Sequence, residues 1–423
     1  MLTRNIRPPL RELLEQLNED GGIIFITGPR QCGKTVLVKN ILELFSFSEM
    51  KFSYFSLSDP AILEKAVINP PKFIRSLKGL VVLDDLHFFP ELIGMIAEYS
   101  ISLRRSVIEK SSSSDQEKSG LILICHDKSL APPDIDMVIM HYLSIYERSA
   151  RSRKPTSPEQ YIIGSTFPSR SNKPYDPRWC QKHVEELIMD ITNRYQIRQL
   201  ENFRKFIKTV ATYIGKAVNL TDMASCIGVS RTTISTWLKI LEDNFIIYLL
   251  HPHQDGFSRN GYKRRTVKTP RLYFHEPALA AFLLGIQDFE SQATIQLKAA
   301  LFENFIILEY LKWMLNRIAE PGLYYWRDNT GNEVPLVIEL ADRLFPVLIL
   351  YQRKLSRRDL DFVERWRKLC GFWWGTGVYA GDNSYMDRCR RLHAWQKPVA
   401  VELVDVPKFH RKNFNLLPVK HKV

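Results

Sequence analysis

Paired cysteines, long apolar runs and a secretion signal are all missing from this sequence of 423 residues. The six cysteines lie far apart and form no C-x-x-C pair, which argues against a zinc module and a disulfide framework. No apolar run approaches the roughly 20 residues of a membrane-spanning helix. The charged start of the chain (MLTRNIRPPLRELLEQLNED) lacks the apolar core of a secretion signal. We therefore expect a cytoplasmic protein with no membrane partner.

Acidic charge is scarce in the later part of the chain. The whole sequence has 59 Lys and Arg against 46 Asp and Glu, a formal charge of +13. Residues 1–150 contain 17 basic and 19 acidic side chains, which leaves 42 basic and 27 acidic side chains for the remainder. A basic surface is therefore expected after residue 150. An apolar fraction of 45% and a charged fraction of 25% are typical of globular proteins.

The patterning divides the chain into four segments. Residues 1–150 alternate helical and strand patterns, which predicts a parallel sheet with helical crossovers. Residues 151–198 begin with a Pro-, Ser- and Arg-rich stretch and are interpreted as a linker or helical connection. Residues 199–262 carry helical spacing and then a strand. Residues 263–423 mix short apolar runs with charged helices, which predicts an α+β domain.

A glycine-rich loop follows the apolar run that ends at Thr27. It matches G-x-x-x-x-G-K-[ST] and consists of Gly28, Pro29, Arg30, Gln31, Cys32, Gly33, Lys34 and Thr35. Glycines let the backbone turn so that successive N–H groups surround one anion. In such a loop the lysine reaches the outer phosphates and the threonine hydroxyl binds Mg²⁺. The sequence therefore predicts a site for ATP and Mg²⁺.

A second strand pattern supplies carboxylates for this site. Four apolar residues, 80–83, precede Asp84 and Asp85. Ligands of open α/β sheets bind at the carboxyl ends of the strands. We therefore expect Asp84 to hold Mg²⁺ together with Thr35. Asp85 and Lys34 are the expected catalytic residues: Asp85 orients or deprotonates the attacking water, and Lys34 reaches the outer phosphates.

These motifs resemble those of a prokaryotic AAA-superfamily ATPase family whose members add a winged helix and a C-terminal restriction-endonuclease-like domain of uncharacterised function. The resemblance runs through TGPRQCGKT, YFSLSDP, VVLDDLHFFPEL and LSIYE, then TVKTPRLYF, ALFENFIILE and YYWRDNTGNEV. It implies a P-loop NTPase of AAA type. Two departures concern catalysis: Asp85 stands where the family has Glu, and residues 125–133, where family members often have an arginine, contain none. Arg194 is then the candidate arginine for phosphoryl transfer.

Two helices joined by a glycine turn are predicted in the third segment. Gly228 ends the first helix and Ser230 caps the second, and the strand of residues 245–250 completes a winged helix–turn–helix. The outward face of the second helix offers donors for phosphates and base edges. Its candidate nucleic-acid residues are Arg231, Thr232, Ser235 and Lys239. The basic residues 263–265 follow where a wing or its connection is expected. A spacer between domains is the alternative interpretation.

The last segment resembles the restriction-endonuclease-like fold without its metal-binding acids. Glu303 is retained, but Pro335 stands at the position of the strand aspartate, and Leu348 and Leu350 replace the Glu-x-Lys pair that active members use. Proline and leucine cannot ligate a metal, so this domain is expected to be inactive as a nuclease. Glu333 and Glu339 are the nearest substitute pair of carboxylates.

Two hypotheses of different class remain. The first is an ATP-binding protein that is a slow or partner-stimulated ATPase with an unidentified protein partner and a possible ring oligomer. The alternative is a protein that binds double-stranded DNA or acts as a scaffold, in which ATP is a structural ligand or a switch. The loop of residues 28–35 supports the first hypothesis. The basic second part of the chain supports the alternative.

Overall fold

A computed structural model describes twelve stretches of the chain. These are residues 4–46, 52–99, 119–149, 157–170, 173, 175–253, 267–286, 295–328, 331–340, 343–370, 375–386 and 390–397. The basic residues 263–265 therefore lie outside the described residues. None of the described helices is long and apolar enough to cross a membrane.

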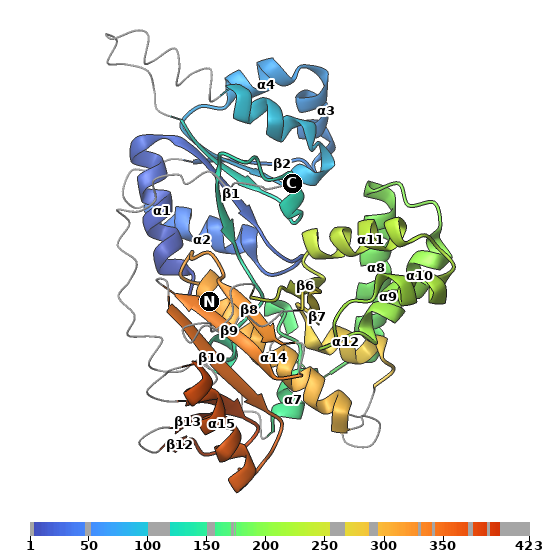
Figure 1. The fold of residues 1–423 in the computed structure, drawn as a ribbon. Coiled ribbons are helices and arrows are strands. Elements are labelled where there is room, and N and C mark those ends of the chain that lie inside the picture. Colours follow the sequence, from blue (N-terminus) through green and yellow to red (C-terminus); the bar gives the residue numbers. More distant parts are fainter. Residues whose placement is uncertain are drawn as a thin grey trace.

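A five-stranded parallel sheet forms the first part of the chain (Figure 1). Its strands lie in the order β2, β3, β4, β1, β5, and every neighbouring pair is parallel. They are β1 (Gly22–Thr27), β2 (Phe52–Ser56), β3 (Leu80–Asp84), β4 (Gly120–Ile124) and β5 (Asp136–Ile139). The parallel sheet predicted from the alternating patterns is confirmed. Because β4 lies between β1 and β3, the loops that follow these three strands meet at one edge.

Helices cover both faces of this sheet. The helices of this part include α1 (Arg7–Asp20), α2 (Lys34–Ser46), α3 (Pro60–Ile68), α4 (Pro70–Ser76) and α6 (Ile145–Ser149). One core places α1 and α2 against Ile24 and Ile26, and the other places α3 and α4 against Phe25. Successive strand residues point to opposite faces, which explains how one apolar strand contributes to both cores. The sheet is therefore buried on both sides, as its continuous apolar runs require.

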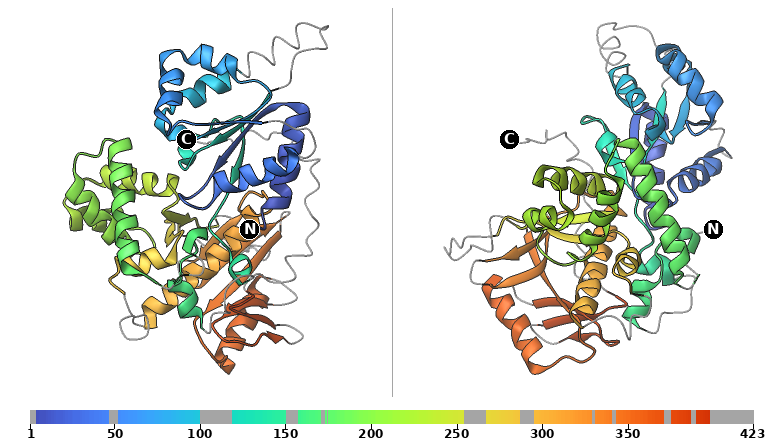
Figure 2. Two further views of the ribbon diagram at one scale, coloured as in Figure 1. Left: turned by 180° about the vertical axis from the view of Figure 1, so that it is seen from behind. Right: turned by 90° about the vertical axis from the view of Figure 1, so that its right-hand side faces the viewer.

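Two helices occupy the described part of the segment that was expected to be a connection. They are α7 (Pro158–Ile163) and α8 (Pro177–Arg194). In α7, Tyr161 is buried and its ring lies 5.0 Å from that of Phe305. In α8, the Asp176 side chain caps the first turn. Figure 2 shows α8 grouped with the following helices beside the parallel sheet. This segment thus contributes to the folded core.

Three short helices and a strand pair follow. They are α9 (Leu200–Ala211), α10 (Leu220–Ile227), α11 (Arg231–Asp243), β6 (Ile247–Leu250) and β7 (Arg271–Phe274). Gly228 ends α10 in the left-handed conformation, and Ser230 caps α11 by accepting from the Thr233 N–H, so both local predictions are confirmed. β6 and β7 are antiparallel. The expected domain boundary after residue 262 falls between these paired strands.

A second, mixed sheet forms the C-terminal part, shown at the bottom of Figure 1. Its order is β12, β13, β11, β10, β9, β8, with parallel pairs only among β10, β11 and β13. The strands are β8 (Leu323–Arg327), β9 (Glu333–Leu340), β10 (Arg343–Leu350), β11 (Gly375–Tyr379), β12 (Tyr385–Met386) and β13 (Arg390–Ala394). The helices are α12 (Pro277–Leu283), α14 (Ile295–Leu315) and α15 (Arg357–Cys370). α14 is buried along most of its length and contacts α7, α12 and β10.

Candidate nucleotide-binding site

The glycine-rich loop connects the end of β1 to the start of α2. Gly28 has φ +144°, and a Cβ on it would lie 1.9 Å from the Met140 carbonyl oxygen, so only glycine fits this close approach. Gly33 has φ +92°, and Gln31 also has a positive φ of 60°. These conformations curl the loop immediately before a helix N-terminus, where backbone N–H groups favour an anion. The loop backbone therefore fits a phosphate group.

Lys34 is the first residue of α2 and folds back over this loop. Its Nζ donates to the carbonyl oxygens of Gly28 and Pro29, at 2.9 Å each. The side chain is buried, and no carboxylate of the described residues forms an ion pair with it. A buried ammonium that is held by neutral oxygens keeps most of its charge uncompensated. An anion in the loop would supply the missing countercharge.

Thr35 and Asp84 meet at the predicted metal position. The Thr35 hydroxyl donates to Asp84 Oδ2 at 2.5 Å, and the Tyr54 hydroxyl donates to the same oxygen at 2.9 Å. Burial is the main cause that raises the pKa of Asp84, and burial together with Asp84 raises the pKa of Tyr54. Hydroxyl and carboxylate oxygens are suitable Mg²⁺ ligands. These two side chains therefore fit the metal that a bound triphosphate carries.

Asp85 follows β3 in a left-handed conformation, with φ 58° and ψ 36°. Its carboxylate accepts from the Ser56 hydroxyl at 2.6 Å, while its backbone N–H donates to Asp84 Oδ1 at 2.8 Å. Aspartate and asparagine adopt this backbone region more readily than most other residues with a side chain. The turn aims Asp85 toward the end of β2, so Asp84 and Asp85 have different partners at the same sheet edge.

Arg4 contacts the glycine-rich loop, and this role could not be recognised from the sequence. The Arg4 guanidinium donates to the Cys32 carbonyl oxygen at 2.8 Å and to the His141 carbonyl oxygen at 2.5 Å, and it pairs with Glu147 at 3.2 Å. Arg4 and Glu147 are both buried. Glu147 is the last residue of the LSIYE motif, and that motif was the only hint in the sequence that Glu147 matters. Arg4 lies 143 residues away in sequence, so nothing indicated that the two residues form a pair.

A second group of side chains lies beyond the carboxyl end of β4, beside the glycine-rich loop. Asp190, on α8, contacts Arg30 at 3.0 Å, Arg194 at 2.8 Å and His126 at 3.5 Å. The rings of His126 and His87 lie 4.2 Å apart. Burial and the neighbouring His126 lower the pKa of His87 to about 3, and burial lowers that of His126, so both imidazoles are neutral at pH 7.

This group also has the composition of a metal site. Ligand atoms of His87, His126 and Asp190 lie within 4.8 Å of one another. Among the residues that the structure describes, His87 Nδ1 and His126 Nε2 have no hydrogen-bond partner, although His126 Nε2 lies 3.5 Å from Asp190. However, the Asp190 carboxylate already holds two guanidinium groups, from Arg30 and Arg194. Their positive charges oppose a second cation at short range. These two guanidinium groups therefore make the position unfavourable for a metal ion.

Arg194, the candidate arginine for phosphoryl transfer, reaches this edge from the end of α8. It donates to Asp127 Oδ2 at 2.9 Å and to Asn244 Oδ1 at 2.5 Å, besides its contact with Asp190. Asp127 lies three residues after β4, and Asn244 directly follows α11. Arg194 thus connects the sheet edge to the end of α11.

The four candidate nucleic-acid residues lie on α11. Arg231, Thr232, Ser235 and Lys239 are all exposed. Lys239 contacts Asp243 of the same helix at 3.5 Å, which offsets part of its charge. The exposed face leaves room for a partner, and it carries two cations and two hydroxyl groups.

Two of the candidate acids of the C-terminal domain, Glu303 and Glu333, form ion pairs with one arginine. Arg271 contacts Glu303 at 3.5 Å and Glu333 at 2.5 Å, and Tyr273 also donates to Glu303, at 2.6 Å. Glu333 and Glu339 stand at opposite ends of β9, about 20 Å apart at the usual rise per strand residue. The substitute pair considered from sequence is therefore wrong.

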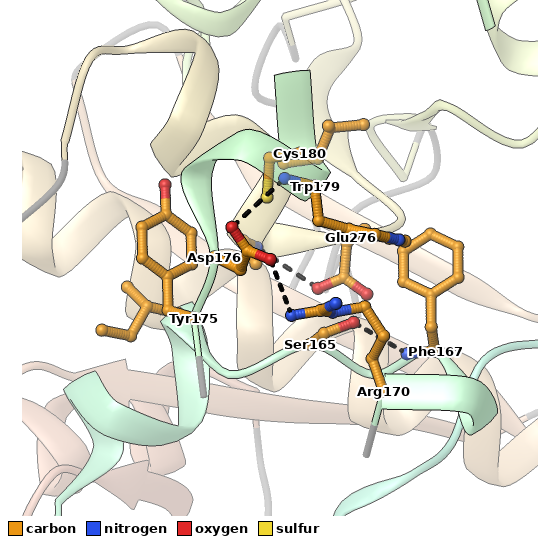
Figure 3. A pocket seen from close by; sticks show the side chains of 11 residues that line it. Ser165, Phe167, Arg170, Tyr175, Asp176, Trp179, Cys180 and Glu276 are labelled. Carbon is orange, nitrogen blue, oxygen red and sulfur yellow. Dashed lines mark hydrogen bonds and ion pairs between the residues drawn. The ribbon is translucent and has the colours of Figure 1, made fainter. Parts of the chain in front are cut away.

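A separate pocket opens between the start of α8 and α12 (Figure 3). Its acids are already satisfied: Asp176 caps α8 and contacts Arg170 at 3.5 Å, and Glu276 accepts from the Thr166 N–H at 3.1 Å and from its hydroxyl. Burial raises the pKa of Glu276. The lining shown in Figure 3 is otherwise largely aromatic and apolar, so we interpret this pocket as a packing feature.

The parallel sheet and the glycine-rich loop define a P-loop fold of the AAA class. Residues 20–122 match the model of the AAA domain. Residues 157–290 match a Domain of unknown function (DUF8612), and residues 298–396 match a Domain of unknown function (DUF4143). The chain thus combines a segment that matches the AAA domain with two later segments that match domains of unknown function. The match to residues 157–290 also includes both β6 and β7.

Similar proteins include an uncharacterized protein of Mycobacterium tuberculosis and one of Mycobacterium bovis. Each is 24% identical over 328 residues, which is 76% of this chain and 68% of the relative. Among solved structures, the Aeropyrum pernix ORC2 protein in ADPNP–ADP complexes has a TM-score of 0.35 and 14% identity, over 66% of this chain and 92% of that chain. AMPPCP-bound DnaA from Aquifex aeolicus has a TM-score of 0.29 and 15% identity, over 57% and 90%.

Proposed function

We propose that this protein binds ATP with Mg²⁺ at residues 28–35 and hydrolyses it slowly, or faster when a partner stimulates it. The observation that carries the proposal is the 2.5 Å contact between the Thr35 hydroxyl and the Asp84 carboxylate, directly beside a buried and uncompensated Lys34. A loop that fits phosphate, a lysine and two oxygen ligands for Mg²⁺ are the parts that nucleotide binding requires.

Each of these side chains would have one task. The loop N–H groups hold the phosphates, and Lys34 neutralises the charge of the outer phosphates. Thr35 and Asp84 hold Mg²⁺, which when bound neutralises charge that develops on the phosphate oxygens. Tyr54 keeps the Asp84 carboxylate oriented through its hydrogen bond of 2.9 Å.

Asp85 would orient the attacking water or accept its proton. Aspartate is one methylene shorter than glutamate, so its carboxylate is set back by roughly 1.5 Å. Misplacement by about 1 Å can lower a rate on the order of 10²-fold. Its hydrogen bond to Ser56 holds it further in the direction of β2. Slow turnover is the consequence that we expect.

Titration with labelled ATP tests this proposal. Lys34→Ala should weaken ATP binding by roughly 10- to 100-fold, because charge-assisted hydrogen bonds are worth about 1.5–3 kcal/mol. Lys72→Ala is the matched control, since Lys72 lies exposed on α4. Equal ATP affinity in wild type and Lys34→Ala would remove the proposed site.

Double-stranded DNA binding is a second candidate function, supported by the exposed face of α11. Arg231 and Lys239 are its cations, and residues 151–423 as a whole are strongly basic. Arg231→Ala/Lys239→Ala should weaken binding to duplex DNA and flatten its dependence on salt, because fewer phosphates are neutralised. Lys182→Ala, on the exposed side of α8, is the control. Affinity that ignores both salt and the double substitution would reject DNA binding by this helix.

A further inference from the structure

We propose that Asp190 is an internal competitor for the terminal phosphate of the nucleotide. Its carboxylate contacts Arg30, Arg194 and His126, and a terminal phosphate would replace it at the two guanidinium groups. The inference rests on the proposed function and adds a regulation of the same site, in which a triphosphate is distinguished from a diphosphate.

One oxygen of Asp190 collects all of these contacts. Asp190 Oδ2 accepts from Arg194 Nη2 at 2.8 Å and from Arg194 Nε at 3.1 Å, and it lies 3.0 Å from Arg30 Nη1 and 3.5 Å from His126 Nε2. Carboxylate and phosphate oxygens offer the same acceptor to a guanidinium group, so a phosphate can replace Asp190 in this arrangement. Burial alone would raise the pKa of Asp190, but contacts with His126, Arg194 and Arg30 lower it overall, and the group stays ionised.

The position of the group makes the competition direct. Arg30 belongs to the glycine-rich loop itself, and His126 follows β4 between the ends of β1 and β3. Burial is the main cause that lowers the pKa of His126, and the charges of Arg194, Lys34 and Arg30 also lower it, so His126 interacts electrostatically with the lysine that would hold the outer phosphates. A carboxylate fixed here repels a terminal phosphate. Arg30 Nη1 and the Nε and Nη2 atoms of Arg194 all contact the same oxygen of Asp190, so a phosphate oxygen that binds these donors has to replace it.

Displacing Asp190 would also change the surroundings of α11. Arg194 Nη2 donates to Asn244 Oδ1 as well as to Asp190. Asn244 Nδ2 in turn donates to the Ile240 carbonyl oxygen at 2.9 Å, in the last turn of α11. Lys128, beside the sheet edge, adds a contact of 3.7 Å to Asp243. A phosphate that draws Arg194 away from Asp190 therefore acts on a side chain that is bonded to the end of this helix.

The test compares ATP and ADP affinities in the full chain with Mg²⁺ present. Asp190→Asn keeps the size of the side chain and removes its charge. It should tighten ATP binding roughly tenfold, the size of one charge-assisted hydrogen bond, and leave ADP binding within about twofold. Glu186→Gln removes a carboxylate from the exposed side of the same helix and should change neither affinity. Asp190→Glu retains the charge and should keep the ATP-to-ADP preference of the wild type.

Unchanged or weaker ATP binding in Asp190→Asn would overturn the competitor role, and so would an equal gain for ADP. Weaker binding would instead mean that Asp190 orients the arginines toward the phosphate.

Thermal unfolding of each variant checks that the fold is retained. Should Asp190→Asn unfold, ATP binding by Asp190→Ser and hydrogen exchange at residues 240–244 of the wild type with ATP and with ADP provide the test. The same exchange with both nucleotides would refute the link to α11. Failure of the proposed function has a different signature, because wild type and Lys34→Ala would then bind ATP alike.

Discussion

Removing the Arg4 side chain should destabilise the AAA domain far more than an ordinary arginine substitution. The Arg4 guanidinium joins three segments, since it contacts Glu147, the Cys32 carbonyl oxygen and the His141 carbonyl oxygen. The exposed fractions of the Arg4 and Glu147 side chains are 5% and 1%. In Arg4→Met, the Glu147 carboxylate would lose its ionic partner and retain neutral donors such as the Asn5 and Ser144 N–H groups.

The magnitude follows from this burial. Breaking a buried ion pair by removing one partner costs about 3–5 kcal/mol, because the remaining charge is uncompensated. For a domain of this size such a loss lowers the melting temperature by roughly 10 °C. The double variant Arg4→Met/Glu147→Gln should lose less than the sum of the two single variants, by about 1–3 kcal/mol. Urea unfolding of the four proteins measures the cycle.

A surface arginine provides the control. Arg11 pairs with Glu15 on the exposed side of α1, with exposed fractions of 55% and 41%, so Arg11→Met should cost at most about 0.5 kcal/mol. The reasoning is refuted if Arg4→Met and Arg11→Met unfold at the same urea concentration, or if the double-variant cycle is additive. Because Arg4 also holds the Cys32 carbonyl, the same variant should bind ATP more weakly.

Two further predictions concern the sheet edge. Asp85→Glu should raise phosphate release, because the longer side chain restores reach toward the attacking water; an unchanged rate with intact ATP binding would contradict the role assigned to Asp85. The neutral imidazole of His87 predicts a pH effect, because its pKa is about 3 in the folded chain and about 6.5 when unfolded. The unfolded state therefore binds more protons between these values, so stability is lost as pH falls below about 6.5, by at most about 2 kcal/mol for His87 at pH 5. The fall in melting temperature from pH 7.5 to pH 5 should be larger in the wild type than in His87→Gln. Equal falls in the two proteins would reject this pKa assignment.

The contiguous features were predictable from sequence because they depend on local backbone requirements. Residues 28–35 need glycine at particular conformations, and the observed φ of +144° at Gly28 explains why the motif tolerates no side chain there. The apolar runs predicted a parallel sheet, since a strand buried on both faces has few polar positions. Gly228 and Ser230 marked helix ends for similarly local reasons.

Contacts between distant segments could not be predicted in this way. Arg4 meets Glu147, and Arg30 meets Asp190, only because separate elements pack together, and neither pair has a sequence spacing that a motif would reveal. The pairing of β6 with β7 was missed because the strands are separated by 20 residues with turn-like and basic composition. The sequence positions of His87 and His126 do not match a metal-binding motif. Their rings lie close together because β3 and β4, which precede them, are neighbours in the sheet.

The Mg²⁺ dependence of ATP affinity tests the central claim most directly. With Thr35 and Asp84 as its ligands, the wild type should bind ATP much more tightly when Mg²⁺ is present than when it is chelated. Asp84→Asn should lose most of that gain while its affinity without Mg²⁺ stays similar. The same gain from Mg²⁺ in both proteins, or no gain in the wild type, would contradict a nucleotide–metal site formed by these two side chains.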